Sequence, residues 1–131
     1  MIIETFFIAV DGDLVGRKIE KLIISSELDE LVTYSHLINE SVNKMRSFSE
    51  NIGGKTYLQG GDNLLVEVAD YQAFVEQIIS SRAEMAASFS VGIGRNAVEA
   101  YLALKFAKSA GRGLIILVEV IDGKYQFKHI A

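Results

Sequence analysis

Two short acidic segments of this chain have the residue types needed to bind a divalent metal ion. An Asp-Gly-Asp sequence at residues 11–13 directly follows an apolar run, and Gly-Gly-Asp-Asn at residues 60–63 separates two later apolar segments. Carboxylate oxygens are preferred ligands of Mg²⁺, and such ions assist reactions of nucleoside triphosphates. Each segment alone is also typical of an ordinary turn. The metal hypothesis therefore requires that Asp11 and Asp62 meet in the folded chain.

Two further segments have features of phosphate binding. Residues 12–16 lie between an expected strand and an expected helix, where backbone amides and the helix dipole favour anions. Lys105, Lys108 and Arg112 recur at spacings of three and four, so a helix places them on one stripe. Alternatively, the first segment is an ordinary strand-to-helix turn and the second is a solvated basic face near a helix C-terminus.

The composition limits the class of protein. The 131 residues suffice for one domain, which we expect to span residues 1–131. Half of the residues are apolar, and the net charge of −4 argues against binding of long nucleic acids, which requires clustered basic residues. The chain contains no cysteine, which excludes disulfides and thiolate metal sites. The first apolar run is too short to span a membrane and follows no basic segment, so we expect a cytoplasmic protein without membrane contact.

Hydrophobic patterning and turn residues divide the chain into six strands and four helices. The expected strands cover residues 2–10, 55–59, 64–68, 88–94, 114–121 and 124–128. The expected helices cover residues 15–24, 27 to about 50, 71 to about 86, and 97 to about 111. Ser26, Asp70 and Asn96 are the expected N-caps of the last three helices, and Glu99 completes a capping box with Asn96.

This order of elements predicts an α+β fold. Its core is the ferredoxin-like βαββαβ arrangement, an antiparallel sheet with helices on one face, followed by C-terminal strands. In that topology, the end of the first strand and the turn at residues 60–63 lie at the same edge of the sheet. We therefore expect Asp11, Asp13 and Asp62 to converge although they are distant in sequence.

The four motifs together resemble a known group of enzymes. Residues 11–13, 60–63, 90–94 (Ser-Val-Gly-Ile-Gly) and 107–112 (Ala-Lys-Ser-Ala-Gly-Arg) resemble the nucleotide-cyclase palm domains. These include the GGDEF diguanylate cyclases and the polymerase palm of type III CRISPR effectors. The strongest resemblance is to the stand-alone minimal CRISPR polymerases, which are single palm domains carrying Gly-Gly-Asp-Asn. It covers nearly the whole chain.

The resemblance implies roles for individual residues. Two Mg²⁺ or Mn²⁺ ions would be bound by a ligand set consisting of Asp11, the Gly12 carbonyl, Asp62 and, as a further ligand, Asp13. Lys108 and Arg112 would bind the triphosphate and act with Asp11 and Asp62 as the catalytic residues. Other expected nucleotide-binding residues share the loops and the helix around these groups: Leu14, Val15, Gly16, Gly60, Gly61, Asn63 and Lys105. Ile19 stands where GGDEF enzymes carry a guanine-reading asparagine, which argues against a diguanylate cyclase.

We therefore expect a Mg²⁺-dependent nucleotidyltransferase. By family likeness it joins two nucleoside triphosphates, with ATP favoured, into a cyclic dinucleotide that signals to an effector in antiphage defence. Because one site holds one donor nucleotide, we expect a homodimer. Two alternatives remain open at this stage: a GTP cyclohydrolase built on the same palm, and a catalytically silent nucleotide sensor.

Overall fold

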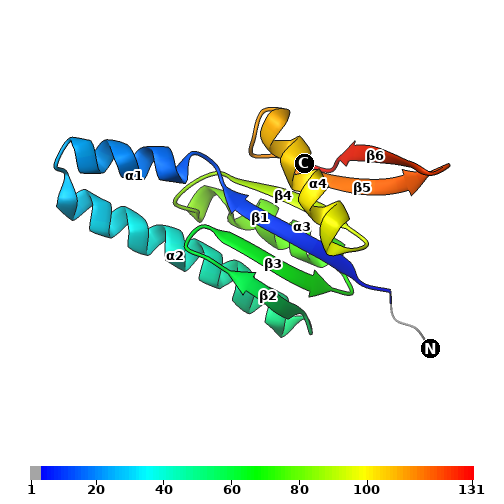
Figure 1. Cartoon of the computed structure of the whole chain (residues 1–131). Helices are drawn as coiled ribbons and strands as arrows, with labels where there is room; N and C mark the ends of the chain where they lie inside the picture. Colours follow the sequence, from blue (N-terminus) through cyan, green and yellow to red (C-terminus); the bar gives the residue numbers. More distant parts are fainter. Residues whose placement is uncertain (1–3) are drawn as a thin grey trace.

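The computed structural model describes residues 4–131, which form a mixed α+β structure around one six-stranded sheet (Figure 1). The strands are β1 (Phe6–Gly12), β2 (Lys55–Gln59), β3 (Asn63–Val68), β4 (Phe89–Gly94), β5 (Ile115–Ile121) and β6 (Lys124–His129). The helices are α1 (Val15–Ile24), α2 (Leu28–Asn51), α3 (Tyr71–Ser81) and α4 (Ala97–Ser109), with a short 3₁₀ helix η1 (Arg82–Glu84) after α3. No helix within this part of the chain is long and apolar enough to cross a membrane.

The strand order is β2-β3-β1-β4-β5-β6, which contains the predicted ferredoxin-like core. Strand β1 lies between β3 and β4 and is antiparallel to both. The core pairs are all antiparallel, as predicted, and the C-terminal strands extend the sheet through a parallel pairing of β4 with β5. Helix α4 connects these two strands, and a helical crossover of this kind returns the chain in the same direction.

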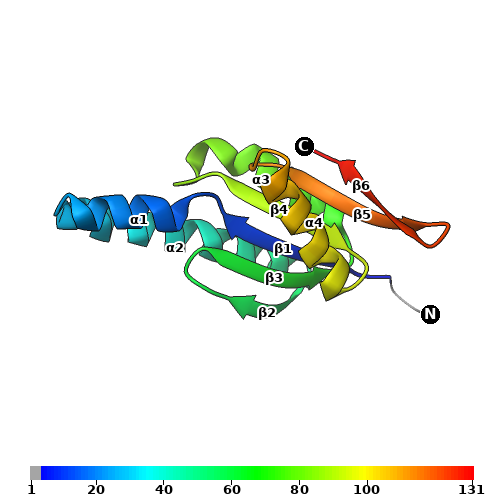
Figure 2. The same ribbon diagram turned by 45° about the horizontal axis from the view of Figure 1, so that its top comes forward.

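As predicted for the core, α2 and α3 pack on one face of the sheet, and α4, which follows the core, covers the other face. Alternate residues of β1 point to opposite sides. Ile8 and Val10 belong to the main core with residues of α2 and α3, whereas Ala9 packs with Ala100 and Leu104 of α4. Figures 1 and 2 show α4 crossing in front of the sheet, with α2 and α3 behind it.

Helix α4 lies unusually close to the sheet because β4 carries two glycines. A Cβ atom on Gly92 would collide with the backbone of α4 at Ala100 and Leu104. A Cβ on Gly94 would lie 2.6 Å from the Ala100 nitrogen. The Ser-Val-Gly-Ile-Gly motif thus allows α4 to pack directly against the backbone of β4. This contact sets the distance between the helix and the end of β1.

Several predicted element ends differ from the structure. The first strand begins at Phe6 and continues to Gly12, so it includes Asp11; residues 2 and 3 of the predicted strand lie outside the described residues. Helix α3 ends at Ser81 rather than near Ala86, because the chain tightens into η1. These shifts leave the order of the predicted elements unchanged.

Two of the three predicted N-caps are confirmed. The side chain of Asp70 accepts a hydrogen bond from the Ala73 amide, and that of Asn96 accepts one from the Glu99 amide. Ser26 does not cap α2, because it adopts a left-handed backbone conformation with φ 54° and the helix begins two residues later. Its amide donates instead to the Ile23 carbonyl at the end of α1.

The two outer strands are irregular or rich in charge. Strand β2 pairs with β3, but its register shifts between Thr56 and Leu58, which marks a β-bulge. Strand β6 begins with Lys124 and carries Lys128 near its other end. At the opposite side of the molecule from β5 and β6, the α1–α2 hairpin extends well beyond the sheet (Figures 1 and 2).

Candidate active site

The β2–β3 turn lies directly against the end of β1. Asp11 is paired with Asn63 in the sheet register, and the Gly12 amide donates a 2.8 Å hydrogen bond to the Asp62 carbonyl. A Cβ atom on Gly12 would lie 3.3 Å from the Asp62 Cβ and 2.6 Å from a Val15 methyl. Glycine at position 12 therefore allows the turn, β1 and the start of α1 to meet.

The carboxylates of Asp11 and Asp62 are close enough to influence each other. Burial raises the pKa of Asp62 above its ordinary value, and the negative charge of Asp11 raises it further. Opposing effects, from the backbone of Asp62 itself and from Lys108, are too small to reverse this shift. The structure thus brings the two distant aspartates to a common end of the sheet, as the topology predicts. We call Asp11, Asp62 and the Gly12 carbonyl the acidic end.

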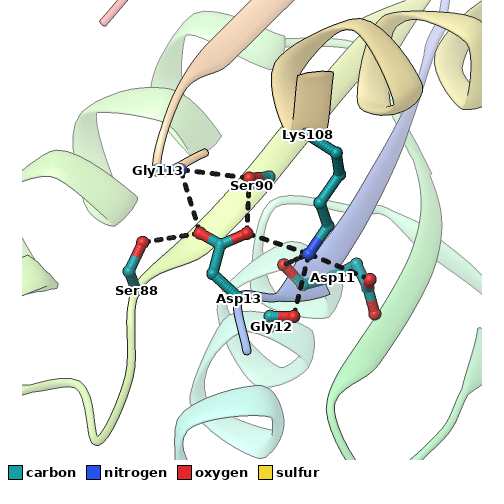
Figure 3. Close-up of polar contacts among 7 residues, drawn as sticks. All are labelled: Asp11, Gly12, Asp13, Ser88, Ser90, Lys108 and Gly113. Carbon is teal, nitrogen blue, oxygen red and sulfur yellow. Dashed lines mark hydrogen bonds and ion pairs between the residues drawn. The ribbon is translucent and has the colours of Figure 1, made fainter. Parts of the chain in front are cut away.

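Lys108 of α4 reaches across the sheet to the acidic end. Its Nζ lies 3.1 Å from Asp11 Oδ2 and 2.8 Å from the Gly12 carbonyl oxygen (Figure 3). The Asp11 carbonyl oxygen is 3.4 Å away. Nζ also lies 2.8 Å from Asp13 Oδ1. Lys108 therefore compensates the charge of Asp11 and Asp13 together.

Asp13 turns away from the acidic end into a buried polar network (Figure 3). Its Oδ1 accepts hydrogen bonds from Ser90 Oγ at 2.7 Å and from Lys108 Nζ. Its Oδ2 accepts from Ser88 Oγ at 2.6 Å and from the Gly113 amide at 2.9 Å. Burial favours the neutral acid, but these bonds outweigh burial and hold the pKa of Asp13 below its ordinary value.

This arrangement argues against the expected role of Asp13 as a further metal ligand. Each carboxylate oxygen already accepts two hydrogen bonds, and the side chain is only 4% exposed. The same contacts leave no oxygen free to act as a general base. Asp13 instead ties together the end of β1, strand β4, helix α4 and the loop before β5.

The remaining oxygen ligands fit a divalent ion that also binds a phosphorylated substrate. Among residues 4–131, no group of three or more acidic, histidine or cysteine side chains is arranged to hold a metal. The acidic end offers two carboxylates and one carbonyl, and Mg²⁺ in nucleotide sites typically binds one or two carboxylates plus substrate phosphates and water. Burial and the charge of Asp11 raise the pKa of Asp62, and an ammonium group already lies against Asp11, so a cation bound here would be stabilised.

A cleft of about 700 Å³ opens beside the acidic end, between α4 and strands β1 and β3. Most of the predicted nucleotide-binding residues line it: Asp11, Gly12, Leu14, Val15, Gly16, Asp62, Asn63, Lys105, Lys108 and Arg112. Gly60 and Gly61 are not in its wall. The Gly60 amide donates to Asn63 Oδ1 at 2.9 Å, so that these residues shape the turn that carries Asp62.

The N-terminus of α1 faces this cleft through Val15 and Gly16. Leu14 precedes the helix with φ 58°, and no described side chain accepts a hydrogen bond from the first turn. The first amides of a helix need external partners, and the helix dipole favours an anion there. The segment at residues 12–16 is therefore suited to hold phosphate oxygens.

Arg112 reaches the cleft in a different way from the one predicted. Helix α4 ends at Ser109, so Arg112 is not on a helical stripe with Lys105 and Lys108. It lies in the following loop with φ 65°, between Gly111 at φ 131° and Gly113 at φ 65°. The hydrogen bond from the Gly113 amide to Asp13 fixes this loop, and thereby the backbone next to Arg112.

Sequence reasoning missed the serines that complete the buried network. Ser88 directly precedes β4, and Ser90 lies within it and is fully buried. A buried serine in an apolar strand requires a polar partner, which is a signal for a neighbouring polar group. Tyr34 of α2 was also missed: burial and the charge of Asp62 raise its pKa, which places its ring near the acidic end.

Comparisons with known proteins bear on the family and the fold. The family model of the minimal CRISPR polymerase domain matches residues 7–118. A diguanylate cyclase/phosphodiesterase from Caldicellulosiruptor saccharolyticus has a similar structure, with a TM-score of 0.59 and 19% identity over 95% of this chain and 80% of that chain. The guanylyl cyclase Cya2 has a TM-score of 0.49 and 13% identity over 97% of this chain and 63% of that chain. No curated protein matches the chain. The first of these structures supports the predicted palm fold.

Proposed function

Because the chain belongs to the minimal CRISPR polymerase domain family, we propose that it is a nucleotidyltransferase that makes a cyclic dinucleotide. Its substrate is ATP, its products are a cyclic di-AMP and pyrophosphate, and the cyclic dinucleotide signals in antiphage defence. The observation that carries the proposal is the meeting of Asp11 and Asp62 beside a cleft lined by Lys108 and Arg112. This combination supports a site in which metal ligands would lie next to cationic phosphate-binding groups.

Asp11, Asp62 and the Gly12 carbonyl are the proposed ligands of two Mg²⁺ or Mn²⁺ ions. When bound, such ions lower the pKa of an attacking ribose hydroxyl and neutralise charge on the transferring phosphoryl group. Asp62 supports this role because burial and the neighbouring charge of Asp11 raise its pKa, so that a bound cation would stabilise its ionised form. Asp13 is a positioning residue in this proposal, since its oxygens are engaged by Ser88, Ser90, Lys108 and Gly113.

The cationic groups of the cleft bind the triphosphate. Lys105, Lys108, Arg112 and the start of α1 line the cleft, and no described side chain caps the first amides of α1. A ribose hydroxyl oxygen forms a bond to the α-phosphorus, and the bond from that phosphorus to the pyrophosphate oxygen breaks. The hydroxyl proton passes to water in the open cleft. Lys108 and Arg112 stabilise the charge on the departing pyrophosphate.

Cyclisation requires this transfer to occur twice between the same two nucleotides. Because one chain offers one acidic end, we propose a homodimer in which two sites face each other. A cyclic-nucleotide effector is the proposed downstream partner.

Incubation of the purified protein with each nucleoside triphosphate and Mg²⁺ or Mn²⁺ tests the proposal. We expect pyrophosphate release and a cyclic dinucleotide of adenosine, identified by mass spectrometry. Asp62→Ala abolishes product, whereas Asp29→Ala, which removes an acid from the first turn of α2, leaves it unchanged. Formate with an opened purine ring would indicate a cyclohydrolase instead. Nucleotide binding without turnover would indicate a sensor.

A further inference from the structure

The ammonium group of Lys108 occupies the position expected of a metal ion. It contacts the Asp11 carboxylate at 3.1 Å and the Gly12 carbonyl at 2.8 Å, two of the three proposed metal ligands. The Asp11 carbonyl oxygen lies 3.4 Å away. All of these partners are oxygens that can also bind a hard cation. Lys108 thus already supplies a cation to Asp11 and the Gly12 carbonyl.

The position of Lys108 is built into the fold. Asp13 holds Nζ from the buried side at 2.8 Å, and Asp13 is itself fixed by Ser90 and the Gly113 amide (Figure 3). The Lys108 side chain is 23% exposed, compared with 36% for Asp11. A partly buried ion pair of this kind is screened less by water and salt than a surface pair. The ammonium group therefore occupies the acidic end as a regular feature of the folded chain.

We propose that Lys108 is a resident cation that competes with divalent ions for Asp11 and the Gly12 carbonyl until a polyphosphate draws it away. This inference rests on the proposed function, because it takes these oxygens as the metal ligands. An ammonium group and a divalent ion cannot both contact the same oxygens, since their charges repel strongly at such distances. Lys108 leaves Asp11 and Gly12 when the ion binds, and its charge then becomes available to phosphate oxygens.

This exchange links the two binding events. By thermodynamic reciprocity, a polyphosphate that binds Lys108 strengthens metal binding, and the metal strengthens polyphosphate binding by the same factor. The protein without nucleotide thus holds divalent ions weakly. The acidic end becomes a metal site when its nucleotide arrives.

The test measures Mn²⁺ affinity in the absence of nucleotide, by electron paramagnetic resonance of the free ion. Lys108→Gln keeps a hydrogen-bond donor for Asp13 but removes the charge, and Lys108→Met removes both. We expect Lys108→Gln to bind Mn²⁺ about tenfold more tightly than the unmodified protein. This factor applies if Lys108 leaves the metal ligands of the unmodified protein free about one tenth of the time. Equal or weaker affinity in a folded Lys108→Gln protein would overturn the inference.

Lys105→Gln is the matched control for charge. Lys105 lies one turn earlier on α4 and lines the same cleft, but its Nζ sits over the Tyr101 ring, 5.2 Å from the ring centroid. The Lys105→Gln substitution changes the net charge as much as Lys108→Gln does, but it leaves Lys108 at the acidic end. Because solvent and salt screen the remaining electrostatic effect, we expect the Mn²⁺ affinity to change by less than about twofold. A gain equal to that of Lys108→Gln would reduce the effect to general electrostatics and overturn the inference.

A measurement on the unmodified protein avoids any dependence on folding of the variants. Acetylation of lysine amines, followed by mass spectrometry, reports how accessible Lys108 is. We expect saturating Mn²⁺ alone to increase acetylation of Lys108 and to leave Lys105 unchanged; no increase at Lys108 would contradict the exchange. If no protein, variant or not, bound Mn²⁺, the metal site of the proposed function would itself fail, whereas equal binding by all of them would overturn the exchange only.

Discussion

Replacing Asp13 by asparagine tests the view that this residue holds the site together rather than binding metal. The substitution preserves size and removes one charge. In the folded protein each Asp13 oxygen accepts two hydrogen bonds, and the asparagine amide nitrogen cannot accept any. The Ser88 hydroxyl can rotate to become an acceptor, but the Gly113 amide cannot, so the loop that carries Arg112 loses a main attachment.

The expected loss of stability is about 3 kcal/mol. Removing one partner of a buried ion pair costs about 3–5 kcal/mol. The lower end applies here because Lys108 keeps its contacts with Asp11 and the Gly12 carbonyl. Domains are typically stable by only about 5–15 kcal/mol, so the loss is a large share of the total. With a urea dependence of about 2 kcal/mol per molar, the unfolding midpoint falls by about 1.5 M.

The contribution of the Asp13 carboxylate to stability depends on pH and decreases in acid. The folded state lowers the pKa of Asp13 below its ordinary value of 3.8. The ionised carboxylate therefore stabilises the protein fully above pH 3.8, and this contribution disappears as the pH falls through the lower folded-state pKa. Urea unfolding followed by circular dichroism at neutral and acidic pH should show that the difference between the unmodified protein and Asp13→Asn narrows in acid.

Asp11→Asn provides the control for the same chemical change two residues earlier. The Asp11 side chain is 36% exposed, and loss of its ion pair with Lys108 is offset by relief of its repulsion with Asp62. We expect its stability to change by less than about 1 kcal/mol. Equal losses for the two variants, or a loss below about 1 kcal/mol for Asp13→Asn, would refute the assigned role of Asp13.

Three further predictions concern packing and charge. Gly92→Ala drives a methyl group into the backbone of α4 and should lower the free energy of unfolding by about 1–3 kcal/mol. Gly16→Ala places its methyl group in open space on a helix and should raise the free energy of unfolding by about 0.5–1 kcal/mol. Opposite shifts in Tm check both variants. Asp62→Asn should raise the Tm of the metal-free protein at pH 7, because the raised pKa makes the ionised form unfavourable in the folded state; this gain should vanish below pH 3.8, and an unchanged gain in acid would contradict it. Phe127→Ala removes a ring stacked 4.5 Å from that of Phe106 and should lower the Tm through loss of packing between β6 and α4, with normal stability as the contrary result.

The fold was largely predictable because its signals are local and agree with one another. The apolar run before Asp11, the turns and the caps at Asp70 and Asn96 each indicate an element, and their order permits few topologies. The parallel pairing of β4 with β5 follows from the helical crossover, whereas the close approach of α4 to the second face depends on packing at Gly92. Such packing cannot be seen in a hydrophobic pattern that treats glycine only as a breaker.

The site was predictable in part. The convergence of Asp11 and Asp62 follows from topology, so the sequence sufficed to infer it. The orientation of the Asp13 side chain does not follow from topology, because the residue after a strand end can turn either toward the acidic end or into the core. Its partners Ser88 and Ser90, which lie just before and within β4, are 75 residues or more away in sequence. The loop conformation of Arg112 was equally hidden, since helical spacing continues past the true end of α4.

The bulge in β2 and the lysines of β6 have a consequence for solubility. An open sheet edge exposes unpaired amide and carbonyl groups, onto which a strand of another molecule can add to start aggregation. The register shift between Thr56 and Leu58 twists one edge away from such pairing. Lys124 and Lys128 place charged side chains along the other edge, where Lys128 pairs with Glu119 of β5. The protein should therefore resist fibril growth at both ends of its sheet.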